Sequence, residues 1–179
     1  SDGGRQCERR RPLAAGRREE AMSRFEEAIE IVLRHEGGYV HDSDDPGGET
    51  NFGISKRSYP HLDIAKLTLE DAIKLYRRDW WDPFSFYDIL PHPDVAIKLF
   101  DLAVNMGTVQ AVKLLQRATR ATCGATLVED GRVGPKTLEA VTWSHGHCLL
   151  AVFKAEAANF YRNLHRPKFE ASWINRAYF

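Results

Sequence analysis

The first strong pattern of apolar positions marks a helix near the start of the chain. Apolar residues recur there at the i, i+3, i+4, i+7, i+8 spacing of one buried helical face: Phe25, Ala28, Ile29, Val32 and Leu33. Ser23 and Glu26 have the S-x-x-E spacing of a capping box, which predicts the start of this helix. Gly37 and Gly38 follow it, and we expect them to supply the left-handed turn that ends it.

Similar patterns predict helices over most of the remaining chain. The Thr68 cap predicts a second helix that ends near Trp81, before Pro83. From Pro93 to Met106 the apolar residues occur nearly all round the helix, which is typical of the buried central helix of a fold. Further helices are predicted at residues 108–120, from Pro135, at residues 147–164 and around residues 169–174.

Residues 39–54 interrupt the helical pattern. They are dense in turn formers with short β-compatible pieces on either side, which predicts a small β or loop lobe. Pro46 biases Asp45 toward an extended backbone and so holds that side chain in one direction. The fold class expected is therefore mainly α, with a small β/loop lobe next to a helical lobe.

Glu36 continues the apolar stripe of the first helix at its last turn. Partial burial and the negative end of the helix dipole both favour the neutral form of a carboxyl there, which is what a general acid requires. The alternative is a solvated Glu at a frayed helix end. The concentration of Asp and Thr in the facing segment favours the general acid, because a purely structural turn does not need those residues.

A calcium loop is the first alternative for the acidic segment. Asp42, Asp44 and Gly47 match three positions of the EF-hand pattern. Pro46 occupies the fifth position, however, and Gly53 stands where the bidentate Glu belongs. We therefore expect no metal in this loop.

A second possible metal site is the run of His145, His147 and Cys148, which lacks an evident fourth ligand. The cysteines, which also include Cys7 and Cys123, are too few and too scattered for a disulfide framework. This usage indicates a reducing compartment.

Charge and hydropathy exclude several classes of protein. The chain has 179 residues, with 25 Lys and Arg against 25 Asp and Glu, so its formal net charge is zero. This balance gives no long-range attraction to nucleic acid or to an anionic membrane. No apolar run reaches the roughly 18–20 residues that span a bilayer. A composition of 43% hydrophobic and 28% charged residues is that of a globular protein.

Residues 1–21 differ from the rest, because they are rich in Arg, Gly and Glu. We expect a flexible leader or an added segment, with a nucleic-acid-binding arm as the alternative. The apolar stretch at residues 12–16 is too weak for a secretory signal, so no signal peptide is recognised.

Residues 35–55, HEGGYVHDSDDPGGETNFGIS, resemble the signature of glycoside hydrolase family 108. This family comprises peptidoglycan-cleaving N-acetylmuramidases found as phage and prophage endolysins. The E-G-G-Y start and the D-P-G-G-x-T-x-x-G-I continuation are both present, although Asp42 is followed by Ser43 where the family commonly has Asp-Pro. Residues 100–107, 111–117 and 130–138 resemble the peptidoglycan-binding-type helical region that follows the catalytic segment in this family.

The resemblance runs from Met22 to the C-terminus and implies a lysozyme-like fold. It implies a catalytic N-terminal part with the β/loop lobe at residues 22–92. A helical peptidoglycan-binding-type part at residues 93–179 would pack with it as one globular unit.

The resemblance also assigns the catalytic residues. Glu36 is the catalytic acid, and Asp45 and Thr50 are its candidate partners, because the order Glu, eight residues, Asp, four residues, Thr is similar to the Glu–Asp–Thr triad of phage-T4-type lysozymes. Asp45 would orient or deprotonate a water that Thr50 positions. Asp42 or Asp44 takes the role of Asp45 if the loop folds otherwise.

The candidates for contact with the sugar are Tyr39, Trp81 and Asn105. Trp81 belongs to an aromatic cluster that supplies either faces for sugar rings or core packing. Asn105 and Asp101 share one face of the predicted central helix, where polar groups either brace neighbouring backbone or touch substrate.

The implied activity is hydrolysis of the β-1,4 bond between N-acetylmuramic acid and N-acetylglucosamine, with inversion and without a cofactor. The alternatives are a lytic transglycosylase, which needs only the acid, and a catalytically silent peptidoglycan-binding module. The implied partner is cell-wall peptidoglycan, with no nucleic acid and no membrane. We expect a monomer that stays in the cytoplasm until a holin-type pore or lysis releases it to the periplasm and cell wall.

Overall fold

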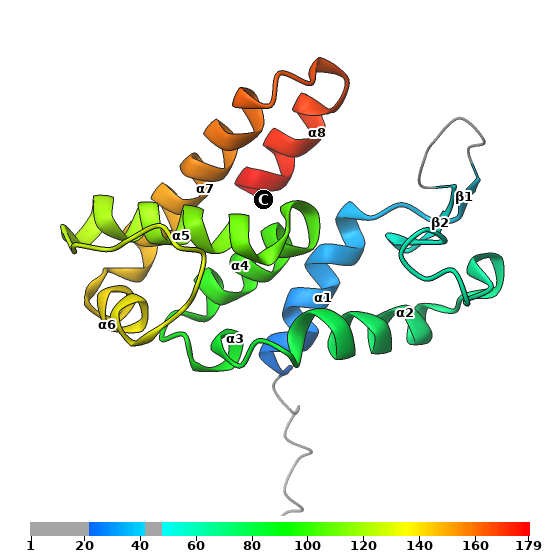
Figure 1. The fold of residues 1–179 in the computed structure, drawn as a ribbon, viewed down its shortest axis with the longest axis horizontal. Helices are drawn as coiled ribbons and strands as arrows, with labels where there is room; N and C mark the ends of the chain where they lie inside the picture. Colours follow the sequence, from blue (N-terminus) through cyan, green and yellow to red (C-terminus); the bar gives the residue numbers. More distant parts are fainter. Residues whose placement is uncertain (1–21, 42–47) are drawn as a thin grey trace, which may run out of the picture.

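The computed structural model describes residues 22–41 and 48–179, and these form a mainly helical protein with a small β-lobe (Figure 1). In chain order, the first elements are α1 (Arg24–His35), β1 (Val40–His41), β2 (Glu49–Asn51), β3 (Ile54–Ser55), the 3-10 turn η1 (Ile64–Lys66), α2 (Leu69–Tyr76) and the π-helical turn η2 (Arg77–Trp81). They are followed by α3 (Phe86–Ile89), α4 (Pro93–Met106), α5 (Thr108–Cys123), α6 (Pro135–Trp143), α7 (Gly146–Asn163) and α8 (Pro167–Tyr178). The predicted mainly α, lysozyme-like fold with a β/loop lobe is thus confirmed.

The start of α1 follows its sequence pattern. Ser23 Oγ accepts a hydrogen bond from the Glu26 backbone N–H, and Glu26 Oε2 accepts one from the Ser23 N–H at 2.6 Å, so the capping box is complete. The predicted apolar face is buried at Phe25, Ala28, Ile29 and Val32.

The end of α1 differs from the prediction. The helix ends at His35, and Glu36 is its C-cap with an extended backbone (φ −87°, ψ 135°). Gly37 and Gly38 are not among the residues of positive φ, so they do not form the left-handed turn that we expected. The extended Glu36 turns the chain instead, and its N–H still bonds to the Val32 carbonyl.

α4 is the central helix, as its all-round apolar pattern predicts. Every residue from Val95 to Ala103 is buried, and the helix packs against α1, α5 and α7. Gly107, with φ of 87°, separates α4 from α5. Figure 1 shows α7 and α8 as an antiparallel pair, which places the end of the chain close to α1.

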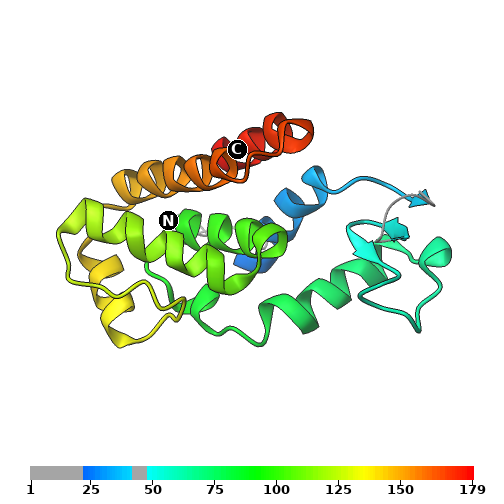
Figure 2. The same ribbon diagram turned by 45° about the horizontal axis from the view of Figure 1, so that its top comes forward.

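The β-lobe lies at one end of the molecule, opposite to α6 (Figure 2). Its three strands are antiparallel in the order β1-β2-β3, with Thr50 paired to Val40 on one side and to Ser55 on the other. The buried Asn51 amide fastens the sheet to the following loop, because it donates to the carbonyls of Ile64 and Leu67 at 3.2 Å.

Trp81 lies at the centre of an aromatic cluster in the core, and only 2% of it is exposed. Its ring stacks on Tyr87 at 4.9 Å and meets Phe25 and Phe100 edge-on at 5.4 and 5.2 Å. The expectation that Trp81 touches a sugar does not agree with this position, because no face of the ring is open to a ligand.

We predict that Trp81→Ala lowers the free energy of unfolding by about 3–5 kcal/mol, the usual cost of removing a buried aromatic ring. Trp143, which is 77% exposed, provides the control. Trp143→Ala should change stability by no more than about 0.5 kcal/mol, as is usual at the surface. Urea unfolding measures both variants, and equal stability losses would contradict the core role of Trp81.

Candidate active site

Glu36 lies where α1, the β-lobe and α8 meet. As the C-cap of α1 it is held at the edge of the helical lobe, and its side chain is 22% exposed. Its Oε1 accepts a hydrogen bond from Arg176 Nη2 at 2.7 Å. The carboxyl is therefore half-buried and fixed in position, although Glu36 reaches this place from an extended C-cap and not from the helical stripe on which the sequence placed it.

Gly53, in the turn between β2 and β3, covers the other side of Glu36. A Cβ atom on this residue would lie 2.8 Å from Glu36 Oε2 and would also collide with the Tyr76 hydroxyl. Its φ of +77° adds a conformational reason for glycine. The Tyr76 hydroxyl donates to the Phe52 carbonyl at 3.0 Å and so holds this turn against the helical lobe.

A cavity of about 360 Å³ adjoins Glu36 through Gly53 and Tyr76, which are two of its lining residues. The rest of its wall combines hydroxyls, one carboxylate, an indole and aliphatic groups, from Ile54, Ser55, Ser58, Tyr59, Asp79, Trp80 and Val104. Hydroxyl-rich walls with an aromatic face suit a carbohydrate, which offers both hydroxyls and flat apolar ring faces.

Tyr59 and Asp79 form a fixed polar pair in this wall. The Tyr59 hydroxyl donates to Asp79 Oδ2 at 2.7 Å. Burial, reinforced by the Asp79 carboxylate, raises the pKa of Tyr59 to about 12, so its hydroxyl stays protonated. The pair thus offers a neutral hydroxyl and a carboxylate in a fixed arrangement.

Behind Glu36, buried charges form a chain of ion pairs. Arg176 Nε donates to Asp101 Oδ1 at 3.1 Å, and Lys98 Nζ donates to Asp101 Oδ2 at 3.1 Å. Arg176, Asp101 and Lys98 are 5%, 0% and 4% exposed. Burial lowers the pKa of Lys98, whereas the carboxylates of Asp101 and Glu36 outweigh burial and raise the pKa of Arg176.

His35 adds a further polar group next to Glu36. Its Nε2 is buried and has no hydrogen-bond partner among the described residues, and its ring packs edge-on against Phe179 at 5.0 Å. Burial lowers the pKa of His35, against the opposing influence of Asp101. The neutral imidazole is therefore favoured beside the charged chain.

Of the two catalytic partners that the sequence predicts for Glu36, the structure describes Thr50 but not Asp45. Thr50 is paired with Ser55 across β2 and β3, so the two side chains share one face of the sheet, and Ser55 lines the cavity. Asp45 lies outside the described residues, as do the alternatives Asp42 and Asp44.

The candidates for sugar contact lie apart from one another. Tyr39 is exposed, and its hydroxyl donates to Glu49 Oε1 at 2.8 Å on the β-lobe. The exposed Asn105, near the end of α4, accepts a hydrogen bond from the Tyr161 hydroxyl at 2.7 Å. Asp101, on the same helix, pairs with Arg176 and Lys98 rather than with the backbone of a loop.

Sequence reasoning missed the roles of Tyr76, Gly53 and Arg176, and it considered Trp80 only as a member of the aromatic cluster from which Trp81 was chosen. Trp80 takes the place expected of Trp81, because the π-helical turn η2 changes the register of the helix at this point. Arg176 is 140 residues from Glu36 in the chain, so no local pattern connects the two.

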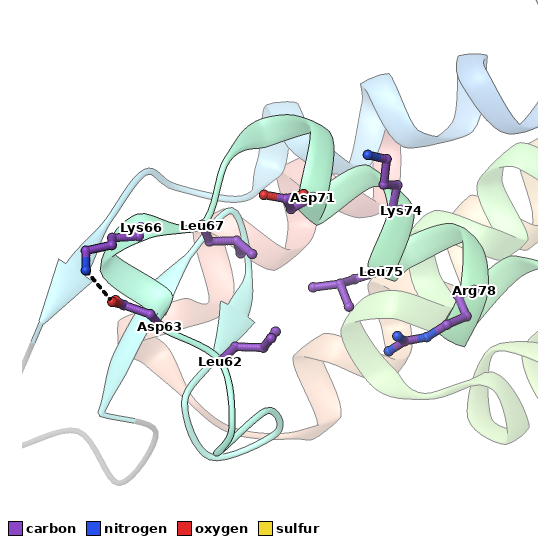
Figure 3. Close-up of a pocket in the computed structure, with 8 residues that line it drawn as sticks. All are labelled: Leu62, Asp63, Lys66, Leu67, Asp71, Lys74, Leu75 and Arg78. Atoms are coloured by element: carbon purple, nitrogen blue, oxygen red, sulfur yellow. Dashed lines mark ion pairs between the residues drawn. The ribbon is translucent and has the colours of Figure 1, made fainter.

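A larger cavity, of about 500 Å³, lies between residues 62–67 and α2 (Figure 3). Leu62, Leu67 and Leu75 point toward its middle, and Lys66 pairs with Asp63 at its rim at 3.2 Å. Neither Glu36 nor the residues that contact it are part of its wall, so it is separate from the carboxyl.

Two family models match the chain. Residues 29–107 match the family described as Glycosyl hydrolase 108, and residues 110–178 match the one described as Predicted Peptidoglycan domain. The boundary between them coincides with the turn between α4 and α5. Glu36, the 360 Å³ cavity and the larger cavity belong to the first region, and Arg176 belongs to the second.

Among solved structures, the chain is similar to that of SagA from Brucella abortus. The two share 28% sequence identity with a TM-score of 0.70, over 86% of this chain and 88% of the other. No curated protein matches the chain. Among the described residues, no helix is long and apolar enough to cross a bilayer.

We predict that Gly53→Ala sharply reduces the turnover of cell-wall peptidoglycan. We choose this substrate because the two matched families are a glycosyl hydrolase and a peptidoglycan domain. The added methyl displaces Glu36, and a misplacement of about 1 Å can cost about 10²-fold in rate. Gly48→Ala is the matched control, because its φ is also positive, at +67°, but no atom of the described residues lies within 4 Å of the new methyl. Both variants carry backbone strain of about 1–3 kcal/mol. Equal rates for the two variants would show that the contact with Glu36 is unimportant.

Proposed function

With residues 29–107 in the glycosyl hydrolase 108 family and residues 110–178 in a peptidoglycan domain family, the chain is a peptidoglycan hydrolase of the glycoside hydrolase type, and we propose that it is an N-acetylmuramidase. The bond broken is the β-1,4 bond between N-acetylmuramic acid and N-acetylglucosamine. The protein acts on the cell wall, as an endolysin or a prophage lysozyme does.

Glu36 is the general acid in this proposal. Cleavage of a glycosidic bond requires a proton for the departing oxygen, because an alkoxide is a poor leaving group. The observation that carries the assignment is the position of the Glu36 carboxyl, which is fixed by Arg176 on one side and lies against Gly53, at the wall of the cavity, on the other. A sugar in that cavity lies within reach of the proton.

A second group must stabilise the positive charge that develops on the sugar ring and supply the water. We assign this role to Asp45, with the Thr50 hydroxyl positioning the water. The pairing of Thr50 with the cavity residue Ser55 supports this placement. If a water fits between Glu36 and Asp45, the anomeric centre is inverted.

The sugar rings are held by the polar and aromatic wall of the cavity. The indole of Trp80 offers a flat face for a pyranose ring, and the Tyr59–Asp79 pair offers hydrogen bonds to its hydroxyls. Because both chemical roles fall to side chains, this mechanism uses no cofactor.

We predict that Glu36→Gln lowers activity by about 10²–10⁴-fold, the usual contribution of a general acid, and leaves binding to cell walls intact. Glu30→Gln is the control, because Glu30 is exposed on the same helix and pairs only with Arg34 among the described residues. Clearing of a cell-wall suspension measures activity, and co-sedimentation measures binding. Wild-type clearing by Glu36→Gln would refute the assignment.

The products distinguish the bond and the mechanism. Mass spectrometry of the released muropeptides should find N-acetylmuramic acid at the reducing end, and NMR during the reaction should first detect its α-anomer, since inversion of a β bond gives α. N-acetylglucosamine at the reducing end would indicate a glucosaminidase. An anhydro end would indicate a lytic transglycosylase, and binding without any products would indicate a silent binding module. Each of these results would contradict the proposal.

A further inference from the structure

Arg176 connects the two family regions at the carboxyl of Glu36. It lies on α8, in the region matched as a peptidoglycan domain, whereas Glu36 lies in the glycosyl hydrolase region. The two side chains are 7% and 22% exposed, and their ion pair measures 2.7 Å. The second region therefore contributes a side chain directly to the site in the first.

The guanidinium of Arg176 is held on its other side by the central helix. Its Nε donates to Asp101 Oδ1 at 3.1 Å, and its backbone carbonyl accepts from Lys98 Nζ at 2.9 Å. Lys98 also binds Asp101. Because these groups are buried, a rotation of Arg176 would leave Asp101 with one partner fewer in a dry site, which is costly.

This arrangement makes the two oxygens of Glu36 unequal. Oε1 accepts an N–H from a guanidinium, which has only donors. When the carboxyl is protonated, its carbonyl oxygen is the better acceptor, so Oε1 keeps this role and the proton resides on Oε2. Oε2 is the oxygen that faces Gly53, at the wall of the cavity.

The positive charge of Arg176 does not act on Glu36 alone. Asp101 shares it, and Lys98 completes a group of two cations and two anions. Among the described residues, the other polar groups near the carboxyl are the His35 imidazole, for which burial favours the neutral form, and the Tyr76 hydroxyl, whose pKa burial and the Glu36 carboxylate raise. Arg176 therefore orients the Glu36 carboxyl and does not add a net positive charge to this group.

We propose that Arg176 is a positioning residue that directs the catalytic proton of Glu36 to Oε2, so that the peptidoglycan domain region completes the active site of the hydrolase region. This inference rests on the proposed role of Glu36 as general acid. It gives α8 a function in catalysis besides any part it has in holding the cell wall.

The variants Arg176→Lys and Arg176→Gln of the 179-residue chain test the proposal, with steady-state kinetics on soluble peptidoglycan fragments. Lys keeps the charge but lacks the planar fork that reaches two carboxylates at once, so kcat should fall about 10-fold. Gln should lower kcat about 10²-fold. KM should stay within about threefold of the wild-type value in both, because Arg176 is not in the cavity wall. Arg166→Gln, at the exposed start of α8, is the control and should retain the wild-type kcat.

The double variant Glu36→Gln/Arg176→Gln separates positioning from a purely structural role. If Arg176 acts through Glu36, the double variant is as slow as Glu36→Gln alone, because effects of residues that act as a unit do not add. A further loss of rate in the double variant would overturn the inference. An unchanged kcat in Arg176→Lys would do so as well, even if the Gln variants fail to fold. Full activity of Glu36→Gln would instead overturn the proposed function itself.

Discussion

The buried chain of charges from Lys98 through Asp101 and Arg176 to Glu36 is the interaction on which the site depends. It joins the first helix, the central helix and the last helix, which lie far apart in the sequence. Buried charges are costly unless they are paired, so each member requires the others. This cost arises where the Glu36 carboxyl is held in a fixed position beside a cavity.

The β-lobe provides the second constraint. Its turn approaches Glu36 so closely that residue 53 has room only for a hydrogen atom, and the Tyr76 hydroxyl holds the turn in place through the Phe52 carbonyl. Glu36 is thus covered by the turn of one lobe and oriented by a helix of the other. Its neighbours Gly53 and Tyr76 belong to the wall of the cavity that also includes Ser55 and Trp80. Rigid support of this kind is what precise proton transfer requires.

The sequence predicted those features that local patterns determine. The capping box of α1, the all-round apolar pattern of α4 and the partial burial of Glu36 at the end of α1 all agree with the structure. Trp80 could not be distinguished from Trp81 in the same way, because both lie in the π-helical turn η2, which departs from the α-helical register. The partnership of Arg176 with Glu36 depends on the path of the whole chain, which no spacing along the sequence records.

A crystal structure of Glu36→Gln with a bound glycan oligomer would show whether residue 36 faces the bond that is cleaved. Glutamine imitates the protonated carboxyl, since its carbonyl oxygen can accept from Arg176 while its amide N–H takes the place of the acidic proton. We expect this amide nitrogen to lie about 3 Å from a bridging oxygen of the glycan, with a sugar ring against Trp80. A glycan seated in the cavity between Leu62 and Arg78, or a bridging oxygen nearest to another carboxyl, would contradict this expectation.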